Sequence, residues 1–381
     1  MKTSHRTIAA LVGAASLAAT ASALRAAEPC PTQCATGKVP LGVAVPLTGT
    51  AAAFGKPTAR AVELAVGEIN KAGGLLGVPV EPVIADDRCD AGMASAVVKR
   101  HANGNVRFVI GSACPAVVME TAESYAKSGV IQFVPTVTAV ELTQRHPDNV
   151  FRMVASDEQE AKALVSYLAR EQQGKKLAVV FGEFFYRRAM AKMIDAALSN
   201  EQKKLTRIES LADVSGAYDR LADRLQKTPP DIIYMSLDAK QAAEFVGKLR
   251  ARGIKSMLMG GQHLLSASFW ANYRSAAQGI YVVTPVASTQ FPAVRNSIDL
   301  LNAAGVTTDI VTLSNVAAVQ TWAEAVKRAG SGDANAVLAA LRAGTFDTAV
   351  GPVAFDAKGD RRDIEYSVLS WKDGRLVPGV Q

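Results

Sequence analysis

The cysteines are the first side chains in this sequence that could do chemistry. Cys30 and Cys34 are close enough to close a small loop, whereas Cys89 and Cys114 each follow a predicted strand. If those two strands are neighbours in a parallel sheet, their loops come within the roughly 4.4–6.8 Å between Cα atoms that a disulfide requires. Zinc is the alternative, but the sequence has no Cys-x-x-Cys pair or clustered histidine. The even number of cysteines therefore favours disulfides in an oxidising compartment.

Acidic and histidine residues give no recognisable catalytic set. Asp86 and Asp87 directly follow a predicted strand, where they suit metal or acid chemistry, a helix cap or a loop network, and we favour the last two. His101, His146 and His263 are isolated, and for the first two we expect solvated or capping roles. The sequence has no phosphate-binding loop, G-x-G-x-x-G, H-E-x-x-H or G-x-S-x-G motif. We expect neither an enzyme nor a bound metal or cofactor.

Alternating strands and helices would position these residues. The first series has strands at Val39–Leu47, Val78–Ala85, Val106–Gly111 and Val130–Pro135, and helices at Ala53–Ala72, Gly92–Ala102 and Pro115–Lys127. The second has helices at Glu158–Gln173, Arg187–Asn200, Tyr218–Lys227 and Ala239–Arg252, and strands at Lys176–Phe181, Arg207–Leu211, Asp231–Ser236 and Ser256–Met259. Each series predicts a parallel sheet with helices on both faces, so the fold class is α/β.

Two such series predict two doubly wound, Rossmann-like lobes joined by hinge crossings. Phe151–Ser156 and Tyr281–Val286 lack helical periodicity and are the candidate crossings, and strands within 353–377 cross back. We expect an N-terminal lobe of residues 37–153 with 286–352, and a C-terminal lobe of 154–285 with 353–381. Ligands of doubly wound folds bind beyond the carboxyl ends of strands. Hinge closure would enclose a small ligand between the lobes.

Residues 1–27 have the pattern of a secretory signal peptide. Lys2 and Arg6 precede the uncharged stretch Thr7–Leu24, and Ala21-Ser22-Ala23 is a small-residue cleavage pattern. No later run approaches the ~20 apolar residues of a membrane span. The charged residues, with a net charge of +7, are dispersed, without basic runs that interleave aromatics, so we expect no nucleic-acid partner. We expect a periplasmic monomer.

Several motifs in this order are characteristic of one family. The chain resembles the leucine/isoleucine/valine-binding proteins, which are periplasmic substrate-binding subunits of ABC importers with a type I periplasmic-binding-protein fold. The matching segments are GVAVPLTGTAAAFG, GEINKAGGLLG, DDRCD, VIGSACPA, VPTVTAVELT, QFPAV and TAVGPVAFDAKGD. The resemblance implies capture of a small solute, a branched-chain or other amino acid, for a membrane permease. It also implies a disulfide between Cys89 and Cys114.

The resemblance assigns ligand-binding residues to the cleft. Phe54 matches an aromatic residue of the side-chain pocket, and Thr136 matches a position whose backbone carbonyl accepts from the ligand ammonium. Thr138 matches a threonine that binds the ligand through its hydroxyl and N–H. Thr138 could equally be an N-cap, because Glu141 completes a T-x-x-E capping box. Tyr186, from the second lobe, matches an aromatic residue that covers the ligand.

Three positions near the expected cleft depart from the family pattern. Pro115, which follows the bordering residues Ala113 and Cys114, replaces a serine that donates to the ligand carboxylate; proline offers neither donor but suits the start of a helix. Gln262 replaces a glutamate that neutralises the ammonium. Asp238 replaces an aromatic residue, and it either restores the lost charge or caps the helix that follows; we favour the cap.

Because of these three departures, the sequence does not fix the chemical identity of the ligand. Losing one hydrogen-bonding arm should cost about 1–3 kcal/mol unless the ligand lacks the matching group. An α-amino acid is favoured over another small solute, such as an aromatic carboxylate or an amide. A ligand-sensing receptor subunit with a separate membrane partner is the other class of function that the sequence allows.

Overall fold

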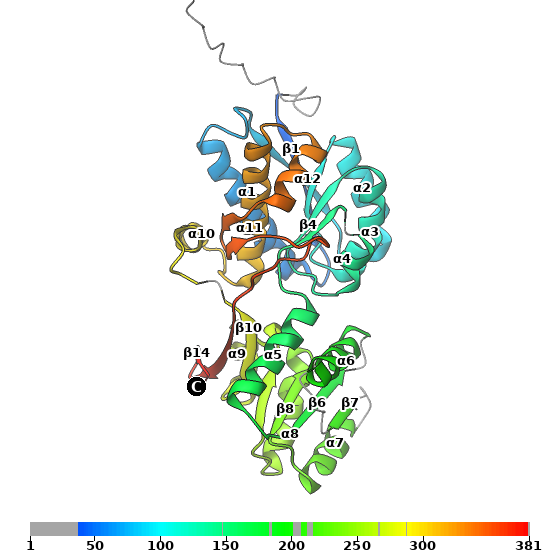
Figure 1. Ribbon diagram of the computed structural model, residues 1–381, viewed down its shortest axis with the longest axis vertical. Helices are drawn as coiled ribbons and strands as arrows, with labels where there is room; N and C mark the ends of the chain where they lie inside the picture. Colours follow the sequence, from blue (N-terminus) through cyan, green and yellow to red (C-terminus); the bar gives the residue numbers. More distant parts are fainter. Residues whose placement is uncertain are drawn as a thin grey trace, which may run out of the picture.

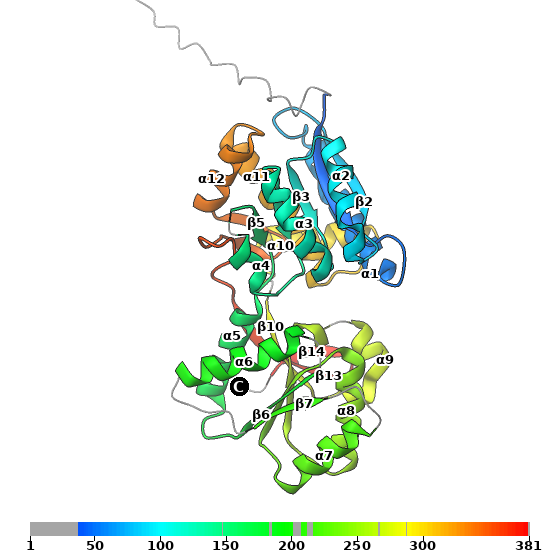
Figure 2. The ribbon, with the colours of Figure 1, turned by 90° about the vertical axis from the view of Figure 1, so that its right-hand side faces the viewer.

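The chain forms two α/β lobes joined by a narrow set of crossings (Figures 1 and 2). The computed structural model describes residues 37–146, 148–182, 185–200, 207–211, 216–265, 267–286 and 288–379, without the side chains of 185–188, 200, 207–211 and 267–268. The predicted signal peptide, Cys30 and Cys34 lie outside these residues. Across the described part of the chain, no helix has the length and apolar character to cross a membrane.

The first lobe is a five-stranded parallel sheet in the order β2-β1-β3-β4-β5. Its strands are β1 (Val39–Val45), β2 (Val80–Asp86), β3 (Phe108–Gly111), β4 (Ile131–Val134) and β5 (Val150–Arg152). Its helices are α1 (Ala52–Lys71), α2 (Ala94–Asn103), α3 (Pro115–Lys127), α4 (Glu141–Arg145), α10 (Pro292–Ala303), α11 (Ile310–Ala329) and α12 (Ala334–Ala343).

Alternation along β1 explains the layers of the first lobe. Leu41, Val43 and Val45 pack with α1, α11 and α12 on one face of the sheet, whereas Ala44 packs with α2 and α3 on the other. Both faces are covered because successive residues of a strand point to opposite sides. The carboxyl ends of β3 and β4 face the second lobe.

The second lobe is a seven-stranded sheet in the order β14-β13-β10-β9-β8-β6-β7, in which β6 to β10 are parallel and β13 and β14 are antiparallel. Its strands are β6 (Leu177–Gly182), β7 (Arg207–Leu211), β8 (Ile232–Ser236), β9 (Met257–Gly260), β10 (Tyr281–Pro285), β13 (Tyr366–Lys372) and β14 (Arg375–Pro378). Its helices are α5 (Asp157–Glu171), α6 (Phe185–Asn200), α7 (Ala217–Lys227), α8 (Ala239–Ala251) and α9 (Ala267–Ala277). The predicted α/β class with two Rossmann-like lobes is confirmed. The residue bounds of the lobes stay a prediction.

The sequence prediction misses two helices and one hairpin. Helix α9 contains a non-helical residue, Tyr273 (φ −133°, ψ 36°), which breaks its periodicity. Helix α12 has only ten residues, of which Val337 and Leu341 are buried. The hairpin of β11 (Phe346–Thr348) and β12 (Gly351–Val353) has strands of three residues each, too short for an alternating pattern.

A buried ion pair joins two of the crossings between the lobes. Arg152, at the end of β5, is fully buried and donates from Nε to Asp360 Oδ1 at 2.7 Å. The other guanidinium nitrogens donate to the Val137 carbonyl at 2.7 Å and to Thr143 Oγ1 at 2.9 Å. Thr143 also donates to Asp360 at 2.9 Å. The crossing that follows β5 and the segment around Asp360, which returns to the second lobe, are therefore held together where the lobes meet.

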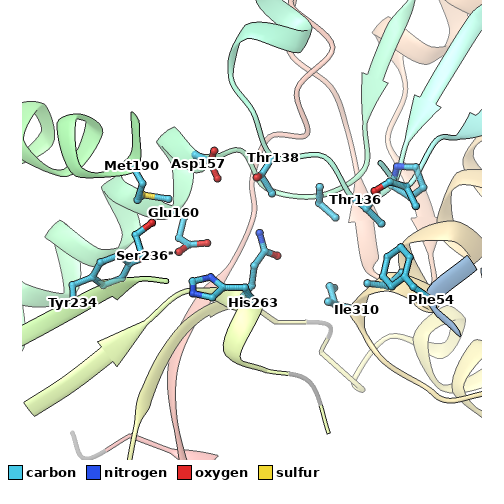
Figure 3. A pocket seen from close by; sticks show the side chains of 15 residues that line it. Phe54, Thr136, Thr138, Asp157, Glu160, Met190, Tyr234, Ser236, His263 and Ile310 are labelled. Atoms are coloured by element: carbon cyan, nitrogen blue, oxygen red, sulfur yellow. Dashed lines mark hydrogen bonds between the residues drawn. The ribbon is translucent and has the colours of Figure 1, made fainter. Parts of the chain in front are cut away.

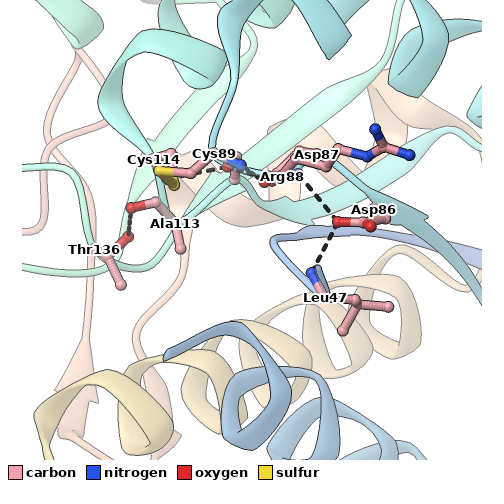
Figure 4. The surroundings of a disulfide bond; sticks show 9 residues. Leu47, Asp86, Asp87, Arg88, Cys89, Ala113, Cys114 and Thr136 are labelled. Carbon is pink, nitrogen blue, oxygen red and sulfur yellow. Dashed lines mark hydrogen bonds between the residues drawn. A yellow bond between two sulfur atoms is a disulfide. The ribbon is translucent and has the colours of Figure 1, made fainter. Parts of the chain in front are cut away.

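Cys89 and Cys114 form a disulfide with their Cα atoms 5.3 Å apart (Figure 4). The two strands that precede these cysteines are not neighbours, because β1 lies between β2 and β3. The loops still meet over the end of β1: the N–H of Asp87 donates to the carbonyl of Val45 at 3.1 Å, and Ser112 Oγ donates to Asp87 at 2.5 Å. The disulfide thus staples two loops at the edge of the sheet that faces the second lobe.

The two aspartates of this turn form a loop network, as favoured from the sequence. Asp86 accepts from the N–H of Leu47 at 2.8 Å and from Thr48 Oγ1 at 2.5 Å. Asp87 also accepts from the N–H of Cys89 at 2.8 Å. Within the described residues, no group of three or more His, Cys, Asp or Glu is arranged to hold a metal ion.

One histidine expectation is wrong. His101 is 1% exposed and lies 2.6 Å from the Tyr125 hydroxyl and 3.1 Å from the Val83 carbonyl. Burial lowers the pKa of His101 to about 4, so the imidazole is neutral at physiological pH. His146, by contrast, is the C-cap of α4, as expected.

Candidate functional site

A cavity of about 300 Å³ lies between the two lobes (Figure 3). Its walls come from the loops after β3 and β4, the start of α1 and α11, the first turn of α5, and the carboxyl ends of β8 and β9. This is the place where doubly wound folds bind ligands. The lining residues are Phe54, Ala113, Pro135, Thr136, Thr138, Val154, Asp157, Glu160, Met190, Tyr234, Ser236, Gln262, His263, Ile310 and Val311.

The first-lobe wall is apolar with two threonines. Phe54, in the first turn of α1, is 41% exposed, and Figure 3 shows it near Ile310 on the side of the cavity away from α5. Thr136 Oγ1 donates to the carbonyl of Ala113 at 3.2 Å, which ties the loop after β4 to the turn before α3. The wall thus presents an aromatic ring and aliphatic side chains to any guest.

Thr138 faces the second lobe. The N-cap interpretation of Thr138 is wrong, because the N-cap of α4 is Val140, which makes no side-chain capping bond. The Thr138 hydroxyl instead hydrogen-bonds the Asp157 carboxylate, and the Thr138 carbonyl accepts from the Asp157 N–H at 3.0 Å. Thr138 therefore joins the first lobe to the start of α5 at the cavity.

Two carboxylates of α5 line the cavity. Ser156 caps this helix, so Asp157 is its first residue and Glu160 lies on the same face almost one turn later. Both are buried, at 8% and 3% exposed. The Tyr234 hydroxyl donates to Glu160 Oε1 at 2.5 Å, and the backbone N–H of Gln262 also donates to this carboxylate.

Burial is the main cause of the shifted pKa values of Glu160 and Asp157. It raises the pKa of Glu160 to about 7, with a further rise from the charge of Asp157, against the lowering effect of the Tyr234 hydroxyl. Burial likewise raises the pKa of Asp157, opposed by the Thr138 hydrogen bond and the charge of Arg152. Each proton is held more tightly than in water because the ionised carboxylates lose solvation.

Glycine at position 261 lets the turn after β9 pack closely against Glu160 within the second lobe. A Cβ at Gly261 would overlap Oε1 of Glu160, and a Cβ at Gly260 would overlap the Leu264 side chain. The 3₁₀ turn Gln262–Leu264 can therefore follow β9 so tightly only because the two preceding residues have no side chain. The pair Gly260-Gly261 brings Gln262 and His263 to the cavity.

Five of the predicted ligand-binding residues line the cavity together: Phe54, Ala113, Thr136, Thr138 and Gln262. Their roles in binding stay a prediction.

Three other candidates are not among the described lining residues. Cys114 is 4% exposed and engaged in the disulfide, and Pro115 is exposed as the first residue of α3. Asp238 accepts from the N–H of Gln241 at 2.8 Å, so the favoured capping interpretation is confirmed, and a role of Asp238 in ligand binding stays a prediction. The side chain of Tyr186 lies outside the described residues.

Apart from Gln262, sequence reasoning missed the second-lobe side of the wall. Glu160 and Tyr234 are paired across 74 residues of sequence, a contact that no local pattern encodes. A local signal did exist: Asp157 and Glu160 are spaced by three residues directly after the predicted crossing Phe151–Ser156. Two acids with this spacing share one helix face, and the crossing places that face at the cleft.

A family model described as a periplasmic binding protein matches residues 38–375. The chain belongs to this family. It is 28% identical over 341 residues to Leu/Ile/Val-binding protein homolog 3 of Brucella melitensis, covering 89% of this chain and 93% of that protein. It is also 28% identical over 334 residues to the leucine-, isoleucine-, valine-, threonine-, and alanine-binding protein of Pseudomonas aeruginosa, covering 87% and 90%. The family resemblance found in the sequence is confirmed.

Solved structures of periplasmic binding proteins share this fold. An ABC transporter substrate-binding protein from Desulfitobacterium hafniense in complex with Leu superposes with a TM-score of 0.76 at 24% identity, covering 90% of this chain and 99% of that one. A solute binding protein from R. palustris in complex with benzoate gives a TM-score of 0.73 at 22% identity, covering 89% and 94%. The family consists of binding proteins, and the cavity between the lobes is the candidate binding site.

Proposed function

We propose that this chain captures a small organic solute in the cavity between its lobes and delivers it to the permease of an ABC importer. The observation that carries this proposal is one cavity of about 300 Å³ whose walls come from both lobes. Ligand pockets of this size, mostly apolar with a few placed polar groups, hold small molecules. The relatives are named for leucine, isoleucine and valine, and one is also named for threonine and alanine.

The walls favour a solute with an apolar body. Five apolar side chains line the cavity: Phe54, Val154, Met190, Ile310 and Val311. Burying an aliphatic group against them gains about 0.8 kcal/mol for each CH₂ removed from water. An amino acid with an apolar side chain fits this part of the cavity.

We infer binding without turnover. Three polar side chains of the cavity are engaged in hydrogen bonds within the protein: Thr136 with the Ala113 carbonyl, Thr138 with Asp157, and Tyr234 with Glu160. Such mutual hydrogen bonds fix side-chain positions for recognition, and solute capture requires no further chemistry.

We also infer export to the periplasm and a monomeric state. The family, the leader-like residues 1–27 and the Cys89–Cys114 disulfide support export, because structural disulfides persist in oxidising compartments. A monomer suffices because one chain supplies both walls of the cavity.

Native mass spectrometry of the freshly purified protein tests capture directly. We expect a bound small molecule that is released on denaturation and rebinds in calorimetry. Phe54→Ala should weaken its binding about tenfold or more, since losing an aromatic contact removes at least ~1.4 kcal/mol. Leu76→Ala is the matched control, because Leu76 is similarly exposed, at 39%, and does not line the cavity. A protein that neither carries nor binds any small solute would contradict the proposal.

A further inference from the structure

The cavity has a polar side and an apolar side. Figure 3 shows Asp157, Glu160 and Tyr234 on one side, and Phe54 and Ile310 on the other. Among the lining residues that the structure describes, two are carboxylic acids, one is histidine and none is lysine or arginine. A guest therefore meets acceptors at α5 and an apolar surface at α1 and α11.

We propose that Asp157 and Glu160 are the specificity-determining pair of this cavity, and that they bind a protonated nitrogen of the solute, an ammonium or amidinium group. This inference rests on the proposed function, since it names the class of solute that the cavity captures. The solute places its cation against α5 and its apolar body against Phe54.

The two carboxylates are held ready for a cation by donors that leave them acceptor capacity. Glu160 receives the Tyr234 hydroxyl and the N–H of Gln262, and Asp157 receives the Thr138 hydroxyl. An ionised carboxylate has about four acceptor positions, so each still accepts further donors. The donors come from three different elements, which fixes the carboxylates before the solute arrives and reduces the entropy cost of binding.

Charge favours a cation at this place. Two carboxylates on one helix face disfavour each other's ionisation when buried, and a cation between them relieves that cost. Arg152 contributes positive charge near Asp157, but its own hydrogen bonds go to Asp360, Val137 and Thr143. A solute whose only charge is a carboxylate would meet repulsion from the pair without a matching cation among the described lining residues.

Matched probes separate the two charges of an amino acid. Three probes share one aliphatic body: L-leucine carries both charges, 3-methylbutylamine carries only the cation, and 4-methylpentanoate carries only the anion. Benzylamine and benzoate form a second pair of cation and anion. Calorimetry of the mature protein at pH 8 should show each amine binding at least about tenfold more tightly than its paired acid. The solute that the protein carries from the cell should contain a basic nitrogen, as read by mass spectrometry.

Substitutions of the two carboxylates test whether they bind the cation. Glu160→Gln and Asp157→Asn should each weaken binding of the amines and of L-leucine by about tenfold to a hundredfold. Glu158→Gln is the matched control: it removes the same charge from the same helical turn, where Glu158 pairs with Lys162 at the surface, and affinity should not change. The far-UV circular dichroism spectrum of each charge variant should match that of the wild type, which guards against a folding defect.

Three results would overturn the inference. They are paired acids that bind as tightly as the amines, a carried solute without a basic nitrogen, or unchanged affinity in both Glu160→Gln and Asp157→Asn. In each case solute capture itself would stand. Failure of the wild-type protein to carry or bind any solute would instead contradict the proposed function, and this inference with it.

Discussion

Tyr234 and Glu160 join the middle of β8 to the first turn of α5 through a hydrogen bond of 2.5 Å. Both side chains are buried, at 1% and 3% exposed, yet both line the cavity. Burial and the Glu160 charge raise the pKa of Tyr234 well above its usual value, so the phenol stays a donor. The hydrogen bond thus fixes the Glu160 carboxylate in the second-lobe wall of the cavity.

The first prediction concerns the pH dependence of stability. The pKa of Glu160 is raised from 4.5 to about 7, so between these values the folded protein holds a proton that the unfolded chain has lost. The free energy of unfolding should therefore fall as pH rises through this window, by about 1.4 kcal/mol per pH unit at most, and level off above it. Asp157, whose pKa is also raised, adds in the same direction.

Urea unfolding of the ligand-free protein between pH 4 and pH 8 measures this slope. Glu160→Gln should flatten it, because glutamine does not titrate, and Glu158→Gln should leave it as in the wild type. Parallel curves for wild type and Glu160→Gln would show that the buried carboxyl does not titrate in this window.

The second prediction concerns Gly261. A methyl group there would overlap Glu160 Oε1, so Gly261→Ala should destabilise the protein and displace the carboxylate from the cavity wall. Overpacking of this kind costs about 1–3 kcal/mol. Gly247→Ala is the control, because a Cβ at this position of α8 meets nothing, and alanine should gain up to about 1 kcal/mol of helix stability. Thermal unfolding checks both, and equal melting temperatures for the two variants would refute the close approach.

The third prediction concerns the ion pair at the crossings. Asp360→Asn removes the charge that compensates the fully buried Arg152, so it should cost about 3–5 kcal/mol of stability. Glu123→Gln, which breaks the solvent-exposed pair with Lys127, should change stability far less. Chemical denaturation of both variants separates the two cases. A small loss for Asp360→Asn would mean that water reaches Arg152.

The fourth prediction concerns the disulfide. Replacing Cys89 and Cys114 together by serine should lower the free energy of unfolding by about 3 kcal/mol, because the bond closes a loop across a sequence separation of 25. Denaturant titration of the double variant, beside the wild type with and without reductant, checks this value. Stability unaffected by both the substitution and the reductant would contradict a structural role.

The α/β alternation was predictable because each element carries its own period. The strands VPLGVAV and IIYMS are buried along their length, and α1 and α11 repeat apolar residues at helical spacing. The order of β1, β2 and β3 was not predictable from those patterns, since the position of β1 between the other two is set by packing of the whole lobe. Local capping was predictable at Asp238, whose partner Gln241 is three residues away.

Half of the candidate site was predictable for a similar reason. Phe54, Thr136 and Thr138 lie in segments that resemble a known family, and all three line the cavity. Glu160 and Tyr234 have no such signal: a glutamate in the first helical turn is usually solvated, and a tyrosine inside a buried strand is usually core. Only the tertiary fold brings this carboxylate and this phenol to the same cavity wall.

A crystal structure of the mature protein with the solute that it carries from the cell would test the central claim most directly. We expect that solute between Phe54 and Glu160, contacted by both lobes, with a protonated nitrogen within hydrogen-bonding distance of Asp157 or Glu160. A solute bound outside this cavity, or a cavity occupied by the protein's own side chains in the presence of a bound solute, would contradict the account.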